Sequence, residues 1–290
     1  MDAKLRSLRP EDGDAVLALS RRALAREEEQ VGVPLWSTSE EVEAELAGLD
    51  HAPEETLRVV EDEGEAAAFG GIELEDEATL FGPLVAPAFR GRKFGSMLID
   101  VSIELAREKG VEWLMASVGA HNIGGRMLLE RAGFRSRAGL DAVYRLLPGS
   151  HRLVEHPSED VTTRIAGSED LDRVLALCRE CFLRSGLSDE AWQRGLERGQ
   201  VRLAEEDGEP VAVVRIIPSR RRVFHGVTAA ARARGVGGSV LSEALEEYWR
   251  EHPDEPLRLA APLENVAATR LYRRQGFTAW LVLQTFELAL

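Results

Sequence analysis

The chain has 290 residues, 44% of them hydrophobic and 30% charged, and a formal net charge of −14 at pH 7. This composition is typical of a globular protein with room for two ordinary domains, and no apolar run reaches the ~20 residues that a membrane-spanning helix requires. The acidic balance argues against a nucleic-acid partner, because phosphates bind basic surfaces. We expect no membrane partner and a cytoplasmic location, because the charged segment 1–10 lacks the apolar core of a secretory signal.

The first predicted elements, a strand at 4–9 and the amphipathic helix after it, recur later in the chain. EDGDAVLAL at 11–19 and EDLDRVLAL at 169–177 agree at seven of nine positions. Each segment follows a strand-like stretch, 4–9 or 162–166, and opens a helix with an acidic first turn, which the helix dipole favours. The chain therefore contains an internal repeat.

The middles and the ends of the two copies also match. RGRKFG at 90–95 corresponds to RARGVG at 232–237, and LLERAGF at 128–134 to LYRRQGF at 271–277. From the glycine that ends the last helix, each copy runs the same distance to its end, at Leu147 and Leu290. The repeat predicts two tandem domains, 1–148 and 160–290, joined by a linker at 148–160. The first copy has extra length at 27–39.

The elements of the second copy predict an α/β fold with a mixed sheet. The periodicity indicates helices at 169–182, 189–198, 237–251 and 266–275, and strands at 200–205, 211–218, 222–228, 257–262 and 278–287. Cys178 and Cys181 lie in the first of these helices. Their C-x-x-C spacing suits a redox pair or half of a zinc site, but they continue the apolar stripe of Val174 and Leu175, so we interpret them as core residues and expect no metal.

A turn rich in glycine and arginine follows the strand at 222–228, and a long helix begins directly after it. The first turn of a helix has free N–H groups at the positive end of the dipole, and Gly235, Gly237 and Gly238 let an anion approach the backbone. Arg232 and Arg234 add positive charge. This pattern indicates a pyrophosphate site. The spacing fits neither a Rossmann nor a Walker loop; the alternative is a glycine-rich helix entry without a ligand.

The same segment resembles the signature of the GNAT superfamily of acyl-CoA N-acyltransferases, Q/R-x-x-G-x-G/A, in Arg232, Gly235 and Gly237. A second mark of that family is an Asn followed seven residues later by a Tyr, and Asn265 and Tyr272 match it; seven residues are two helical turns, so both share a face. The resemblance implies two tandem domains, each a splayed mixed β-sheet flanked by helices. It also implies acetyl-CoA between the fourth and fifth strands and direct attack by an amine, without metal.

The resemblance assigns roles to individual residues of the second copy. His225 would donate its backbone N–H to the thioester carbonyl, and Tyr272 would protonate the leaving thiolate, unless it only packs. Asn265 would contact CoA, cap its helix, or both. Residues expected to bind the cofactor are Val227, Arg232, Arg234, Gly235, Val236, Gly237, Gly238, Ser239 and Asn265.

The general base is the uncertain role. An alkyl amine with a pKa near ~10.4 is almost entirely protonated at pH 7. Family members carry Glu or His nine or eleven residues before the signature arginine, where this chain has Val223 and Arg221. His225 shares their face of the strand and is either a base or a packing residue. The run 220–222 either binds an acceptor carboxylate or forms a solvated strand end.

The first copy keeps the cofactor positions but lacks two catalytic ones. Leu129 stands at the tyrosine position, and Pro83, which has no N–H, stands at the oxyanion-donor position. We therefore expect a catalytically degenerate domain that can still bind CoA. Its expected cofactor-binding residues are Val85, Arg90, Arg92, Lys93, Phe94, Gly95, Ser96 and Asn122.

The predicted function is transfer of an acetyl group from acetyl-CoA to the primary amine of a small molecule, in a monomer that is an internal pseudo-dimer, or in a homodimer. One alternative is a protein or peptide N-acetyltransferase. Another is a non-catalytic, CoA-binding tandem pseudo-enzyme.

Overall fold

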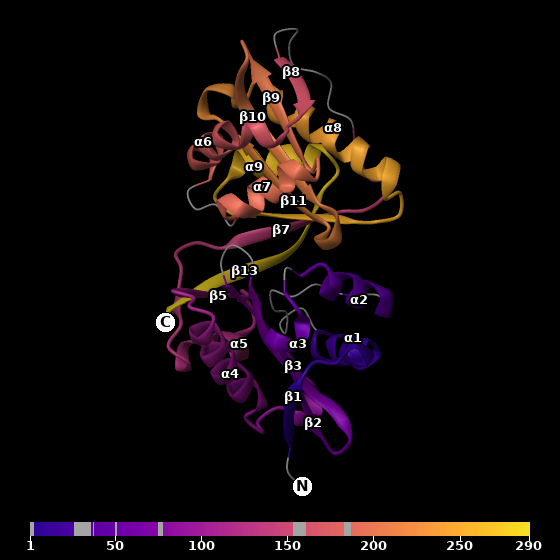
Figure 1. The fold of residues 1–290 in the computed structure, drawn as a ribbon, viewed down its shortest axis with the longest axis vertical. Coiled ribbons are helices and arrows are strands. Elements are labelled where there is room, and N and C mark those ends of the chain that lie inside the picture. Colours follow the sequence, from indigo (N-terminus) through magenta and orange to yellow (C-terminus); the bar gives the residue numbers. More distant parts are fainter. Residues whose placement is uncertain are drawn as a thin grey trace. The chain divides into compact units, whose positions relative to one another are not determined.

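The computed structural model describes residues 3–25, 36, 38–49, 51–74, 78–152, 161–182 and 187–290. Most of the predicted insertion at 27–39 and of the predicted linker at 148–160 lies outside these residues. The chain forms two compact units (Figure 1). Unit 1 consists of Met1–Asp141 and Leu281–Leu290, and unit 2 of Ala142–Trp280.

Unit 1 is a mixed sheet between two layers of helices. Its neighbouring strands are antiparallel except for the parallel pair β4–β5. The helices α1 and α2 cover one face, and α4 and α5 cover the other (Figure 1). The strands, in spatial order, are β1 (Lys4–Ser7), β2 (Leu57–Asp62), β3 (Glu65–Leu74), β4 (Ala78–Val85), β5 (Trp113–Gly119) and the end of β13 (Thr278–Ala289), with β6 (Arg135–Ser136) beside β13. The helices are α1 (Gly13–Ala23), α2 (Ser39–Ala47), α3 (Pro53–Thr56), α4 (Phe94–Glu108) and α5 (Ile123–Arg131).

Unit 2 repeats this plan. The helices α6 and α7 pack on one face of the sheet and α8 on the other. The strands, in spatial order, are β8 (Val161–Ile165), β9 (Val201–Glu206), β10 (Glu209–Ile217), β11 (Arg222–Val227), β12 (Leu257–Pro262) and β7 (Asp141–Leu146). The helices are α6 (Leu171–Cys181), α7 (Asp189–Glu197), α8 (Val236–Glu251) and α9 (Val266–Arg274). Every element predicted for this copy is present, with ends that differ by at most a few residues.

The last strand of each repeat completes the sheet of the other unit. β7 follows the first repeat's helix α5 in sequence, yet its residues from Ala142 onward belong to unit 2, beside β12. β13 ends the second repeat, yet its residues from Leu281 onward belong to unit 1 and pair antiparallel with β5, from Leu283↔Gly119 to Ala289↔Trp113. The limits 1–148 and 160–290 delimit the repeats, whereas the compact units exchange these strands.

One aspartate of each repeated nine-residue segment forms a clamp with an arginine of the preceding strand. In unit 1, two nitrogens of Arg6 donate to Asp12 at 2.7 and 2.8 Å, and Arg6 also binds Glu61. In unit 2, Arg164 donates to Asp170 at 2.6 and 2.7 Å and also binds Glu205. Each clamp ties the first strand of its unit to the start of the following helix.

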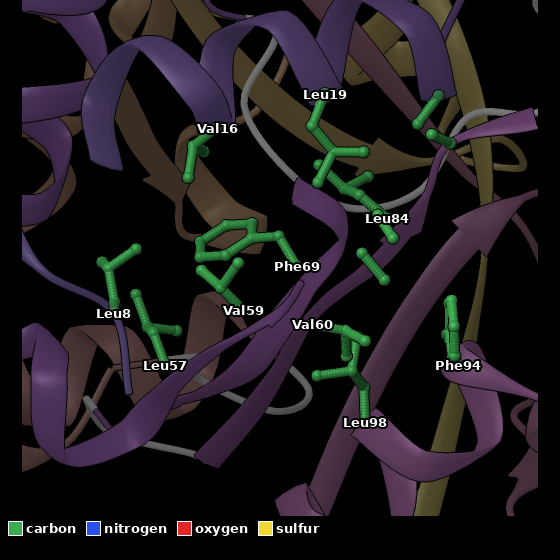
Figure 2. Packing of buried hydrophobic residues seen from close by; sticks show 14 of the residues in the cluster. Leu8, Val16, Leu19, Leu57, Val59, Val60, Phe69, Leu84, Phe94 and Leu98 are labelled. Carbon is green, nitrogen blue, oxygen red and sulfur yellow. The ribbon is translucent and has the colours of Figure 1, made fainter. Parts of the chain in front are cut away.

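The helices are held by apolar packing on both faces of each sheet. Figure 2 shows Val16 and Leu19 of α1 pointing toward Phe69 on β3, and all three side chains are fully buried. In unit 2, Cys178 is 2% exposed within the cluster below α6, and Cys181 packs against that cluster. Burial raises the pKa of Cys178 to about 12 and that of Cys181 to about 11. The interpretation as a core residue is confirmed for Cys178, whereas Cys181 is only partly buried, at the edge of the cluster.

Candidate active site

The two predicted phosphate loops share one backbone conformation. In unit 2, Ala233 and Gly235 have φ of +62° and +84°, and α8 begins at the next residue. In unit 1, Gly91 and Lys93 have φ of +80° and +66°, and α4 begins at the next residue. Alternating left-handed residues turn successive N–H groups toward one side, and the helix start adds its own N–H groups. Both loops therefore have the geometry of an anion site.

The loop glycines also let helix and strand approach each other. A Cβ atom at Gly237 would lie 2.7 Å from Cγ2 of Val227 and 3.1 Å from Nε2 of His225. At Gly95, the equivalent residue, it would lie 3.6 Å from Cγ2 of Val85 on β4 and 3.0 Å from Cδ2 of Leu128 on α5. Gly237 therefore packs α8 closely on β11, which the sequence analysis did not anticipate.

The arginines of the loops bind protein groups in the structure. Nε of Arg232 donates to the carbonyl of Val227 at 3.2 Å, as Nε of Arg90 does to that of Val85 at 3.4 Å. Arg234 forms an ion pair with Glu206, and Arg92 forms one with Asp62 at 2.5 Å. The signature arginines thus brace the end of the fourth strand, and the backbone N–H groups of each loop are its candidate hydrogen-bond donors to an anion.

The sheet of each unit opens between its fourth and fifth strands. In unit 2, β11 and β12 pair at Arg222↔Arg258, and both strands continue well beyond that point. In unit 1, β4 and β5 pair at Ala78↔Leu114 and Thr79↔Met115 and then continue in the same way. The splayed mixed sheet that the sequence resemblance implied is confirmed in both units.

Tyr272 and His225 lie together at the opening of unit 2. The ring centroids are 5.9 Å apart, and Oη of Tyr272 lies 3.5 Å from Nδ1 of His225. Burial lowers the pKa of His225 to about 4, so the imidazole is neutral at physiological pH. Burial raises the pKa of Tyr272, which therefore keeps its proton. The pair unites a protonated phenol with a neutral imidazole that can accept a hydrogen bond.

The helix cap is the second feature shared by the two copies. The side chain of Asn265 accepts a hydrogen bond from the N–H of Ala268 at 3.1 Å, and that of Asn122 accepts one from Gly125 at 2.8 Å. The capping role that was expected for Asn265 is confirmed.

The strand before the loop offers few groups that could act as a base. Val223 is 4% exposed and belongs to the core, and Arg221 forms an ion pair with Glu255 at 3.5 Å. Arg220 is 5% exposed. The expectation of a solvated strand end at 220–222 is therefore wrong for Arg220, which folds inward at the turn before β11.

Unit 1 has a cavity of about 450 Å³ at its loop. Pro83 and Leu129 line it, so the two positions that replace the oxyanion donor and the tyrosine face the same space. Every cofactor residue predicted for the first copy except Arg92 also lines it: Val85, Arg90, Lys93, Phe94, Gly95, Ser96 and Asn122.

Sequence reasoning missed two residues at the opening of unit 2. Gln275 is fully buried and donates to the carbonyl of Gly238 at 2.7 Å, so it ties the end of α9 to the first turn of α8. Tyr144 packs against Tyr272, with ring centroids 5.7 Å apart. Its position in the first repeat gave no signal that it would lie there.

Two kinds of feature are absent from the described part of the chain. Within it, no three His, Cys, Asp or Glu side chains gather as metal ligands would. None of the helices described combines the length and the apolar character that are needed to cross a bilayer.

Comparisons with known proteins agree with this geometry. The profile of the acetyltransferase (GNAT) family matches the chain twice, at residues 21–134 and 169–277. No functionally curated protein matches the sequence.

Among solved structures, a GCN5-related N-acetyltransferase from Sphaerobacter thermophilus is 22% identical, with a TM-score of 0.75, over 99% of this chain and 95% of that one. A tandem GNAT protein from the clavulanic acid biosynthesis pathway is 18% identical, with a TM-score of 0.67, over 99% and 98%. A putative acetyltransferase from Pyrococcus horikoshii is 16% identical, with a TM-score of 0.66, over 99% and 89%. These likenesses establish the fold. Together with the double profile match, they show that this chain belongs to the acetyltransferase (GNAT) family, as a member with two tandem copies.

Proposed function

We propose that the chain transfers an acetyl group from acetyl-CoA to the primary amine of a small molecule, and that the reaction takes place in unit 2. The observation that carries the proposal is the Tyr272–His225 pair, which lies beside a phosphate loop at the opening of the sheet. Direct attack on a thioester needs a cofactor site and a proton for the leaving thiolate, and the second repeat offers candidates for both.

The residues of unit 2 fit the cofactor by charge and shape. The N–H groups of 234–239 would bind the pyrophosphate, because they combine a helix start with two left-handed residues. Beyond Arg222, β11 leaves its pairing with β12, so Val227 would offer backbone groups to the pantetheine arm. The backbone N–H of His225 would donate to the thioester carbonyl.

The chemistry requires one proton to reach the sulfur. The amine nitrogen forms a bond with the acetyl carbon, and the bond between that carbon and sulfur breaks. Tyr272 gives its proton to the sulfur and regains one from the new ammonium group, directly or through water. The raised pKa keeps Tyr272 protonated before the reaction. The neutral His225 would orient the phenol by accepting its hydrogen bond through Nδ1, with the ring proton on Nε2.

We propose that unit 1 binds a CoA thioester and does not turn it over. Its cavity contains the loop residues that the family uses for CoA, but Leu129 cannot donate a proton and Pro83 has no N–H. The unit would therefore contribute cofactor binding or stability to the protein. A protein or peptide acceptor for unit 2, and a non-catalytic CoA-binding pair of units, remain the rival functions.

The first experiment measures thiol release from acetyl-CoA over a panel of small amines and lysine peptides. We expect release with a small amine, and Tyr272→Phe should lower turnover roughly 100-fold while the affinity for acetyl-CoA changes little. Release only with peptides would favour the protein acceptor. No release with any acceptor, combined with normal CoA binding, would favour the pseudo-enzyme.

The second experiment separates the two loops. Ala233 and Gly91 are equivalent, exposed and left-handed, and an aspartate tolerates that conformation. Ala233→Asp should place a negative charge against the pyrophosphate and abolish turnover. Gly91→Asp should remove one calorimetric CoA site and leave most of the turnover.

The matched controls are Ala233→Asn and Gly91→Asn, which keep the shape and carry no charge. Both should bind CoA as the wild type does. Loss of turnover in Gly91→Asp and its survival in Ala233→Asp would show that the active unit is unit 1.

A further inference from the structure

Tyr144 lies where the sequence repeat does not place it. It precedes the end of the first repeat at Leu147, but it sits on β7, within unit 2. Its side chain is 2% exposed, in the same core cluster as Tyr272 and Phe277. The first repeat therefore supplies an aromatic residue to the unit that holds the proposed proton donor.

Tyr144 contacts the helix of Tyr272 in two ways. Its ring packs against the Tyr272 ring, with centroids 5.7 Å apart and planes at 58°. Its hydroxyl and that of Thr269 lie 2.8 Å apart and share a hydrogen bond. Thr269 precedes Tyr272 by three residues, which is about one helical turn, so both contacts fall on one face of α9.

Other rings bound the remaining sides of the Tyr272 side chain. His225 lies 5.9 Å from it and Phe277 5.8 Å, both measured between centroids. With Tyr144, three rings surround one phenol, which is itself 5% exposed. Packing of this kind fixes a side-chain rotamer, and the hydrogen bond to Thr269 fixes Tyr144 in turn.

In unit 1, the core beside the fifth strand contains no counterpart of the Tyr272 hydroxyl, because Leu129 stands at that position. There the strand beside β5 contributes Phe286 to the core cluster that also contains Leu129. The three tyrosines of the chain, Tyr144, Tyr248 and Tyr272, all lie in unit 2. The hydroxyl-bearing pair is thus confined to the unit for which we propose catalysis.

We infer that Tyr144 is a positioning residue for Tyr272: through its bond to Thr269 it holds the phenol of Tyr272 toward His225 and the opening of the sheet. This inference rests on the proposed function of unit 2. The first repeat then supplies a positioning residue to the reactive site, although Leu129 stands at the tyrosine position in its own cavity.

The kinetic test uses the full chain and removes one hydroxyl group at a time. Tyr144→Phe and Thr269→Val each delete one partner of the hydrogen bond and keep the shape. Each should lower kcat roughly fivefold and leave KM for acetyl-CoA within about twofold. The double variant should be no slower than either single variant, because both remove the same bond. Independent, multiplying effects, or an unchanged kcat in Tyr144→Phe, would overturn the inference.

The matched control is Tyr248→Phe. Tyr248, on α8, is also buried in unit 2; its hydroxyl donates to Glu255 at 2.9 Å, and its ring packs against Trp249 and His252. This variant loses a comparable hydrogen bond and should keep the wild-type kcat. If it slowed turnover as much as Tyr144→Phe does, the loss would reflect general stability and the positioning role would fall.

A spectroscopic test of the same inference does not depend on enzymatic activity. The chain has three tyrosines, so ring-labelled tyrosine gives three signals, which the Phe variants assign. Tyr144→Phe and Thr269→Val should each shift or broaden the Tyr272 signal, and Tyr248→Phe should not. An unmoved Tyr272 signal would refute positioning. A moved signal in a protein that acetylates no acceptor would support positioning and refute the proposed function.

Discussion

Burial decides what His225 can do. With a pKa of about 4, the imidazole is already deprotonated throughout the physiological range, and it is a weak acceptor of a proton from an ammonium group. Its neighbour Tyr272 is protonated over the same range. At the scale of single residues, the pair therefore combines a hydrogen-bond donor and an acceptor, and under the proposed function the amine must arrive neutral.

This predicts a distinctive pH profile. Only the neutral amine attacks, so kcat/KM should rise about tenfold per pH unit from pH 6 to 9 and level off near the pKa of the amine itself, ~10 for an alkyl amine. His225→Gln should keep this shape, because no titration of His225 falls in the window. A plateau that begins near pH 7 and disappears in His225→Gln would show that His225 acts as the base.

The residues that sequence reasoning found are those whose roles are local. The cap of Asn265 and the loop of Gly235 depend on a few neighbouring positions, which the sequence displays directly. Tyr144 could not be found, because its partners Thr269 and Tyr272 lie more than a hundred positions away and in the other repeat. The packing of Gly237 on Val227 is likewise set by how helix and strand meet.

At the scale of elements, the repeated clamp fixes where the first helix of each unit begins. Asp170 accepts two hydrogen bonds from Arg164 and one from the N–H of Gly167 at 3.0 Å, and its side chain is 4% exposed. The hydrogen bonds from Arg164 lower the pKa of Asp170 to about 2, against burial, which raises it. The ionised carboxylate is therefore favoured by folding.

The clamp predicts an acid-dependent loss of stability. Because the folded pKa lies below the unfolded value of 3.8, the stabilisation of about 2 kcal/mol is complete above pH 4 and is lost as the pH falls toward 2. Asp170→Asn should lower the free energy of unfolding by about this amount at pH 7 and by about 1 kcal/mol less at pH 3, as measured by urea unfolding. A difference that is the same at both pH values would contradict the assignment.

The positions of the helices could be predicted from the sequence, because a helix start and a glycine at a helix end each depend on a few neighbouring residues. α8 and α9 begin within a residue of their predicted starts, since Gly235 and Asn265 mark them. The sequence did not show which unit's sheet β7 joins, or which one β13 joins. Both strands follow a helix that ends in Gly-Phe and both are apolar, so either could close either sheet until the tertiary pairing forms.

At the scale of the whole molecule, unit 1 depends on residues from the far end of the chain. Phe286 on β13 is fully buried among residues of unit 1 and faces the cluster of Leu114 and Phe134. Unit 2 is continuous in sequence from Ala142 to Trp280. A change near the C-terminus should therefore weaken the N-terminal unit first.

Phe286→Ala tests this dependence. Truncation of a buried phenylalanine should cost about 3–5 kcal/mol and leave a cavity beside β5. Hydrogen exchange should accelerate at 113–131 in unit 1 and stay unchanged at 236–251 in unit 2. Faster exchange in 236–251 alone would mean that the last strand stabilises the other unit. Ala289→Ser, at an exposed position of the same strand, should leave both regions unchanged.

Strand exchange also determines which unit can complete its sheet first while the chain is being synthesised. Unit 2 has its whole sheet once residue 280 has been made, whereas unit 1, whose first strands are the earliest to emerge, waits for 281–289 to cover β5. Until then β5 is an open sheet edge, the kind that recruits strands from other chains. A nonsense mutation that removed residues 281–289 would therefore damage unit 1, which precedes unit 2 in the sequence, and the product would be prone to aggregate.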